Sequence, residues 1–110
     1  MIDWDRVEEL RSEVGAEDFA DIALLFLSEV DGVAARLAAG ADPATLEGDL
    51  HFLKGGALNL GFARLAALAA AGERQAAAGT PVDLAALLDC YAGSRAEFLA
   101  RTGLASQLTG

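Results

Sequence analysis

The chain has 110 residues, which predicts one domain that is large enough to bury its own core. It is rich in alanine and leucine and has only two prolines, so we expect an all-α fold. The formal net charge is −9 and basic residues do not cluster, which argues against binding to nucleic acid or to an anionic membrane.

The first predicted element is a short helix at residues 3–14, with Asp3 as its N-terminal cap. The clearest helix follows at residues 17–38, where large apolar residues recur at helical spacing until Gly40 ends the pattern. The apolar stripe of this second helix comprises Phe19, Ile22, Phe26, Val30, Val33 and Leu37. Leu24 and Leu27 lie off that stripe.

The pair Asp42-Pro43 is a cap followed by proline, and it predicts a third helix from residue 43 to about residue 59. A fourth amphipathic segment continues from Phe62 to about Ala78. The sequence leaves open whether residues 59–61 form a break between these two segments or only a bend.

The last predicted helix follows Thr80-Pro81, a second cap-plus-proline pair, and ends near Gly103. Arg95 falls within its apolar stripe, so we expect this side chain either to snorkel to the surface or to pair with an acid. The domain is expected to cover residues 1–103, and residues 104–110 are expected to fray. Short connections make sequential helices antiparallel neighbours, which predicts an antiparallel up-down four-helix bundle with a short additional N-terminal helix.

The inventory of reactive residues excludes several kinds of site. With one histidine and one cysteine, Cys90, the chain can form neither a zinc centre nor an intrachain disulfide, so we expect no metal site. The glycine-rich phosphate loop of nucleotide-binding proteins is also missing. No apolar run approaches the roughly 20 residues that span a bilayer, and we expect a cytoplasmic location.

The single histidine, His51, begins the stretch HFLKGGALNLG at residues 51–61. It lies about 130 degrees from the centre of the apolar face, which predicts an exposed position in the middle of the third helix. Lys54 lies one turn further on and places a positive charge beside the ring, where it suits a phosphoryl group. Gly55, on the same face, costs about 0.5–1 kcal/mol relative to alanine and would let a partner's backbone come close. Gly56 points toward the core and would permit close packing of a neighbouring helix.

This stretch resembles the signature of the histidine-containing phosphotransfer (HPt) domain, through His51, Leu53, Lys54, Gly55, Asn59, Leu60 and Gly61. The resemblance implies a four-helix bundle in which His51 accepts a phosphoryl group from a receiver-domain phosphoaspartate and passes it to another receiver. Lys54 would help to neutralise the phosphate, and Gly55 would give the receiver access. The chain would be a phosphocarrier rather than an enzyme. It would need no cofactor of its own, because the receiver would supply Mg²⁺.

The resemblance also implies partners, namely response-regulator receiver domains and a hybrid sensor kinase, and we expect a monomer. Two positions depart from the family pattern. Gly56 stands where the family often has a serine that can support the histidine by hydrogen bonding. Phe62 stands where a small residue is common, which could change the local packing or the docking surface.

Five apolar residues that lie off the core stripes, or at their edges, could form one docking patch around His51: Leu24, Leu27, Phe52, Leu58 and Phe62. Packing against the first helix could instead bury Leu24 or Leu27. A second function therefore stays open beside phosphotransfer. On that alternative the chain is a non-phosphorylated helical interaction module that binds a signalling partner through its exposed helix face.

Overall fold

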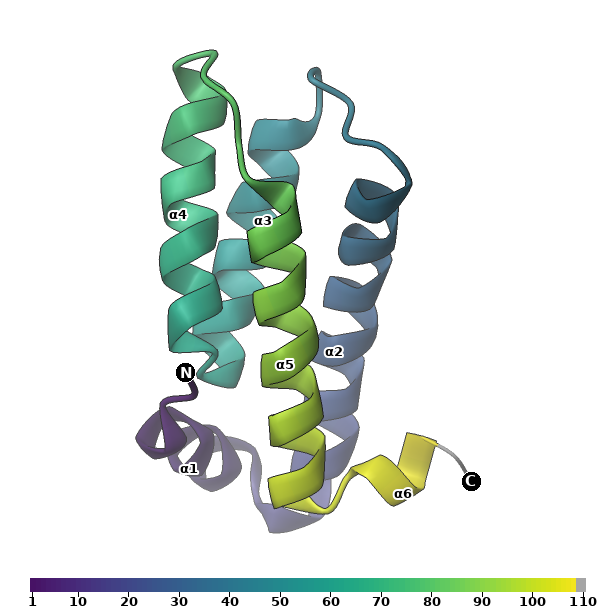
Figure 1. Cartoon of the computed structure of the whole chain (residues 1–110). Helices are drawn as coiled ribbons and strands as arrows, with labels where there is room; N and C mark the ends of the chain where they lie inside the picture. Colours follow the sequence, from purple (N-terminus) through teal and green to yellow (C-terminus); the bar gives the residue numbers. More distant parts are fainter. Residues whose placement is uncertain (109–110) are drawn as a thin grey trace.

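The computed structural model describes residues 1–108, and over that range the chain is built of helices (Figure 1). The helices are α1 (Trp4–Val14), α2 (Ala16–Ala39), α3 (Leu46–Leu60), α4 (Ala63–Ala77), α5 (Leu84–Thr102) and α6 (Ala105–Leu108). Helices α2 to α5 stand side by side and α1 lies across one end of them. Contacts join α2 to α3, α3 to α4, α4 to α5 and α5 back to α2, which closes a four-helix bundle. The predicted all-α fold class is confirmed.

The start of α1 is fixed by the predicted cap. The Asp3 carboxylate accepts hydrogen bonds from the backbone N–H groups of Asp5 and Arg6, which would otherwise lack partners. At the other end, Gly15 has a φ of 87° and separates α1 from α2. Because glycine adopts this conformation without steric cost, the two helices can meet at a single residue.

Helix α3 begins at Leu46, three residues later than predicted. The Asp42 carboxylate does act as a cap, but it accepts from the N–H of Ala44 and holds residues 43–45 in a turn. The cap-plus-proline signal therefore marks the turn that leads into the helix rather than the first helical residue.

Helix α5 begins at Leu84, so the predicted start at Thr80-Pro81 is wrong. The N–H and the hydroxyl of Thr80 both donate to the carbonyl oxygen of Gln75, so Thr80 closes the end of α4. The cap of α5 is Asp83, whose carboxylate accepts from the N–H of Ala86. The predicted end at Gly103 is confirmed.

A true break separates α3 from α4, which decides the question left open at residues 59–61. Gly61 ends α3 in the left-handed conformation, with a φ of 78°. Its carbonyl oxygen accepts a hydrogen bond of 2.6 Å from the N–H of Asp3. The residue that caps α1 is thus attached to the turn of the α3–α4 hairpin.

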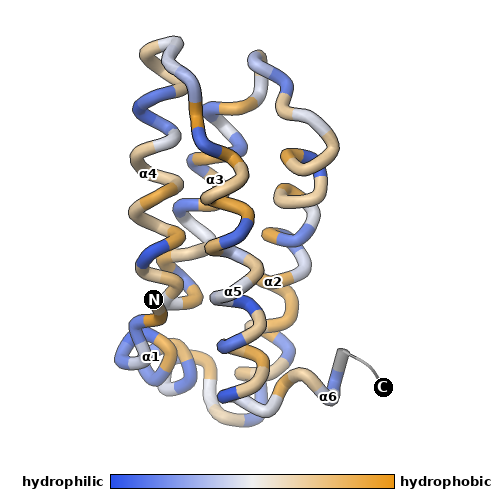
Figure 2. The backbone as a smooth tube through the Cα atoms, viewed as in Figure 1, coloured by the Kyte–Doolittle hydropathy of each residue, from blue (hydrophilic) through white to orange (hydrophobic). Residues whose placement is uncertain are grey.

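The core face of α2 is broader than the predicted stripe. Its buried residues are Phe19, Ala23, Leu27, Val30, Val33 and Leu37. Ile22 and Phe26 are only half-buried, because α2 packs between α3 and α5 and turns part of its surface toward each. Along each helix of the bundle, apolar and polar residues alternate in the manner of helices that bury one face (Figure 2).

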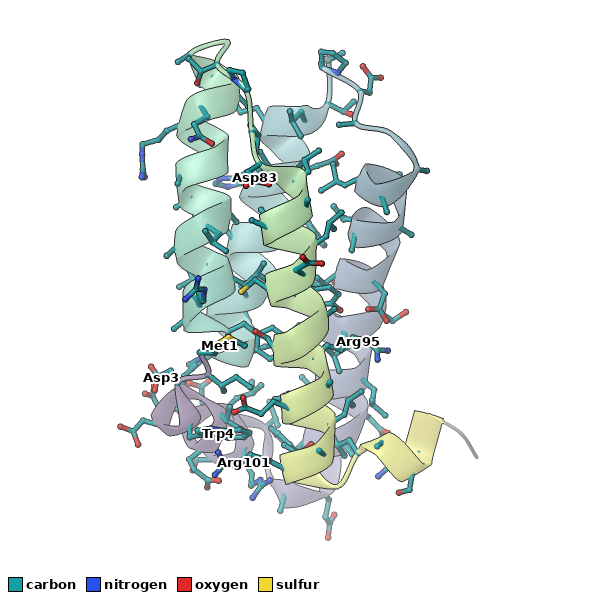
Figure 3. All side chains as sticks on the ribbon, viewed as in Figure 1. Met1, Asp3, Trp4, Asp83, Arg95 and Arg101 are labelled. Carbon is teal, nitrogen blue, oxygen red and sulfur yellow. The ribbon has the colours of Figure 1, made fainter. Side chains whose placement is uncertain are left out.

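Aromatic side chains fill the end of the bundle that α1 covers. The Phe62 ring lies 5.5 Å from the Phe98 ring, edge to face, and 6.3 Å from the Tyr91 ring. Trp4 of α1 stacks on Phe98, and the guanidinium of Arg101 lies over the Trp4 ring, 4.4 Å from its centroid (Figure 3). These contacts hold α1 against α5 and place Phe62 in the core.

Arg95 pairs with an acid, one of the two outcomes expected for it. Its guanidinium donates to both carboxylate oxygens of Asp31 on α2, at 2.9 and 3.0 Å. The hydroxyl of Tyr91 donates to the same carboxylate. Burial and the neighbouring Asp31 charge raise the pKa of Tyr91, so the phenol keeps its proton and this link between α2 and α5.

Residues 104–108 of the tail, which was expected to fray from residue 104 to 110, are ordered in the structure. Leu104 is buried in the core, and residues 105–108 form α6. Residues 109–110 lie outside the described part of the chain. Within residues 1–108, no helix is both long and apolar enough to cross a bilayer.

Candidate functional site

His51 lies in the middle of α3 and points outward, as its position in the helix predicts. Its side chain is 67% exposed, and its Nδ1 atom lies 2.9 Å from Oε2 of Glu73 on α4. A carboxylate can only accept a hydrogen bond, so the neutral ring carries its proton on Nδ1 and donates it to Glu73. The lone pair is then on Nε2, on the other side of the ring.

Lys54 reaches the same carboxylate from the next turn of α3. Its Nζ atom donates to Oε1 of Glu73 at 2.7 Å. This hydrogen bond is the main cause that lowers the pKa of Glu73, and the contact with His51 adds to the effect. Glu73 is therefore ionised at neutral pH and holds the ring with one oxygen and the ammonium group with the other.

Glu73 is the residue of this site that sequence reasoning missed. It lies 22 residues after His51 and on another helix. The signal that could have found it is symmetry about the break, because His51 and Glu73 each lie eleven residues from Phe62. In an antiparallel hairpin with a short turn, residues at equal distance from the turn face each other. That argument requires residues 59–61 to be a break, which the sequence left open.

Gly55 is exposed, and no contact within residues 1–108 accounts for its missing side chain. A β-carbon built at this position would meet no atom of those residues within 4 Å. The space beside the backbone is open to solvent, one turn after His51 on the same face of α3. This geometry supports the prediction that a partner approaches here, and the role itself stays a prediction.

Gly56, in contrast, is required by packing inside the bundle. A β-carbon there would lie 2.7 Å from Cγ2 of Val30 on α2, which is closer than real atoms approach. The predicted close approach of a neighbouring helix is therefore confirmed. A serine at this position would meet the same obstacle. The side chain that contacts the His51 ring is Glu73 of α4.

We expect Gly56→Ala to lower the free energy of unfolding by about 1–3 kcal/mol, because Val30 and α2 must move to admit the methyl group. Urea unfolding followed by circular dichroism measures the change. Gly55→Ala is the matched control one residue earlier. It should be neutral or should stabilise the chain by up to about 1 kcal/mol, since alanine favours the helix and meets no atom. Equal effects of the two substitutions would contradict this assignment.

The predicted docking patch is only partly exposed. Phe52 and Leu58 are 44% and 58% exposed on α3, and Leu24 is half-buried. Leu27 and Phe62 are buried, at 1% and 0% exposure, so their prediction as docking residues is wrong. Phe62 belongs to the aromatic core, and Leu27 is covered because α2 also packs against α5.

An exposed leucine on α2 was not among the predicted docking residues. Leu25 is 53% exposed. Residues 22–27 are apolar throughout, so hydrophobicity alone could not show which of their side chains face solvent. The contacts of α2 with both α3 and α5 decide this.

A shallow depression lies beside the ring between α3 and α4 and is lined by Glu47, Lys54, Ala70, Glu73, Arg74 and Ala77. Its charged groups have both signs; Glu47 and Arg74 are exposed, and Lys54 and Glu73 are half-buried. No group of three or more His, Cys, Asp or Glu residues within residues 1–108 is placed to hold a metal ion.

Residues 5–97, most of the chain, match the family model of the Hpt domain. The match includes His51, Lys54 and Glu73 and all of the helices from α2 to α4. No curated protein and no solved structure matches the chain.

Proposed function

Because the chain belongs to the Hpt domain family, whose members carry phosphotransfer in two-component phosphorelays, we propose that His51 accepts a phosphoryl group from a receiver-domain phosphoaspartate and passes it to another receiver. The observation that carries this proposal is that the Nε2 atom of His51 is left free to act as a nucleophile. The contact of Nδ1 with Glu73 leaves Nε2 with its lone pair, on a side chain that is 67% exposed. Hpt domains are phosphocarrier modules, and this chain would act as one.

The neutral imidazole needs no general base for this reaction. Nε2 attacks the phosphorus atom, the bond to the aspartate oxygen breaks, and the aspartate leaves as a carboxylate. The ring gains positive charge as the bond forms, and Glu73 lies where it stabilises that charge. Lys54 would help to neutralise the phosphoryl oxygens. The receiver would supply Mg²⁺ and the in-line geometry.

The surface of α3 suits the approach of such a partner. Gly55 presents bare backbone beside His51, and the exposed apolar side chains of Phe52 and Leu58 lie on the same helix. Hpt domains interact with receiver domains and kinases. We propose that receivers dock on this surface, that a hybrid sensor kinase is the upstream partner, and that the protein acts as a cytoplasmic monomer.

Intact-mass spectrometry after mixing the chain with a phosphorylated receiver and Mg²⁺ tests the proposal. Several receivers should be tried, each with and without Mg²⁺. We expect a gain of one phosphoryl group that is lost in acid and that fragmentation places on His51. The absence of any gain with every receiver would contradict the proposal.

The alternative, a non-phosphorylated interaction module, rests on the exposure of Phe52 and Leu58. The two functions differ in whether binding has a chemical consequence. If receivers bind the chain and compete for one surface, but no phosphoryl group reaches His51, the alternative is favoured.

We expect Gly55→Gln to slow phosphoryl transfer from a receiver about tenfold or more, since a side chain now stands where the partner's backbone approaches. The helix should keep its stability, because the position is open and glutamine is the better helix former. The rate is measured by quenching the reaction at a series of times and determining the phosphorylated fraction by mass spectrometry. Labelling by phosphoramidate, a small donor, should be unchanged in the same variant. If transfer from the receiver is also unchanged, Gly55 has no role in access.

A further inference from the structure

The contact between Glu73 and His51 remains possible after phosphorylation, because the phosphoryl group would bind the opposite nitrogen of the ring. This inference rests on the phosphotransfer proposed above. We propose that Glu73 keeps the proton on Nδ1 of phosphorylated His51, and so extends to higher pH the form of the carrier that can release its phosphoryl group. Glu73 is thus a positioning residue that acts through the ring.

The geometry favours the protonated ring. A ring that bears a phosphoryl group on Nε2 and keeps its proton on Nδ1 is a cation. The Oε2 atom of Glu73 lies 2.9 Å from Nδ1 and belongs to a carboxylate that can only accept. An opposite charge at hydrogen-bond distance favours the charged form of a titrating group.

The proton on Nδ1 decides what leaves when the phosphoryl group is passed on. An aspartate oxygen of the receiver attacks phosphorus, the Nε2–P bond breaks, and its electron pair returns to Nε2. If Nδ1 holds its proton, the leaving group is neutral imidazole. If Nδ1 has lost it, the leaving group is the imidazolate anion, which is far more basic and leaves far more slowly. The protonated fraction therefore sets the pH range of transfer.

Besides Glu73, the helices that meet at the site carry other charged groups, and none of those within residues 1–108 forms a hydrogen bond with the ring. They are Glu47, Asp49 and Lys54 of α3, Arg74 of α4 and Arg36 of α2. Asp49 is paired with Arg36 at 2.8 Å, and Lys54 with Glu73 at 2.7 Å. Among residues 1–108, Glu73 alone forms a hydrogen bond with the ring of His51.

Glu47 offers a matched control, since it lies one turn before His51 on α3 and is exposed. Glu47→Gln and Glu73→Gln remove the same charge from the same neighbourhood. In Glu73→Gln the amide oxygen can still accept from Nδ1, so the hydrogen bond can persist while the charge is lost.

The wild type and both variants should be phosphorylated with phosphoramidate, and the label should be located on His51 by mass spectrometry. Phosphorus NMR then follows the phosphohistidine signal as the pH changes. We expect the titration midpoint to fall by about one pH unit in Glu73→Gln. In Glu47→Gln it should stay within about 0.3 unit of the wild type, because an exposed charge at longer range is screened. The pH at which transfer to a receiver falls to half its maximum should move with the midpoint.

The outcomes separate this inference from the proposed function. Equal midpoints in all three chains, with His51 labelled, would overturn the role of Glu73 and leave the carrier intact. Equal falls of the titration midpoint in both variants would also overturn it. They would show that any nearby negative charge has this effect, and that the contact between Glu73 and His51 has no special role. A wild-type chain that neither phosphoramidate nor any receiver can label would overturn the proposed function as well.

Discussion

His51→Gln should abolish phosphoryl uptake from a receiver, to below about one hundredth of the wild-type level, since the site then has no nucleophilic nitrogen. Glutamine is chosen because its amide N–H can still donate to Glu73, so the link between α3 and α4 can be kept. The side chain is 67% exposed, and the free energy of unfolding should change by less than about 0.5 kcal/mol. Intact-mass spectrometry measures uptake, and urea unfolding measures stability.

Binding to a receiver should survive in this variant, because the apolar side chains of Phe52 and Leu58 remain exposed on α3. Titration calorimetry with an unphosphorylated receiver provides that control. Full uptake in His51→Gln would show that another residue accepts the phosphoryl group. Loss of uptake together with loss of the helical signal would mean that the variant has unfolded, and His51→Ala would then be compared with it.

Gly61→Ala should cost about 2–4 kcal/mol of folding free energy, the largest stability effect that we expect from a single methyl group in this chain. Two causes combine. Gly61 has a φ of 78°, which is strained for any residue with a β-carbon, and that carbon would lie 2.6 Å from the carbonyl oxygen of Asp3. To relieve the contact, the chain must loosen the 2.6 Å hydrogen bond between the Asp3 N–H and the Gly61 carbonyl.

Gly103→Ala separates these two causes. Gly103 ends α5 with a φ of 76°, and a β-carbon there would meet no atom of the described residues 1–108 within 4 Å. Its substitution should therefore show the backbone strain alone, about 1 kcal/mol. Urea unfolding of both variants gives the difference. Similar losses in the two would show that the approach of Asp3 to Gly61 contributes nothing to stability.

Much of the fold follows from local chemistry that the sequence displays. The Asp3 cap, the helix end at Gly103 and the all-α class depend on a few neighbouring residues, and each is as predicted. The wrong helix start at Thr80-Pro81 has a different origin. A threonine before a proline can close the helix behind it as readily as open the next one, and Thr80 bonds to Gln75. Local sequence does not decide between these two uses.

The features of the candidate site also fall into those that one helix determines and those that depend on the packing of several helices. The exposure of His51 and the packing of Gly56 follow from angles on one helix, which the spacing of residues fixes. The burial of Leu27 and Phe62 and the contact of Glu73 depend on how helices lie against one another. The angle of a residue on its own helix carries no information on the register between two helices, so these three could not be predicted by that means.

The α3–α4 hairpin holds His51, Lys54 and Glu73 without help from a third helix. Substitutions at exposed positions of α2, such as Leu25, are therefore expected to leave the proposed phosphotransfer chemistry unchanged while they change the surface that a partner meets. In evolutionary terms, duplicated copies of such a chain can diverge in the partners they recognise without passing through an inactive intermediate. The same separation gives a designer a fixed reactive hairpin and a variable helix beside it.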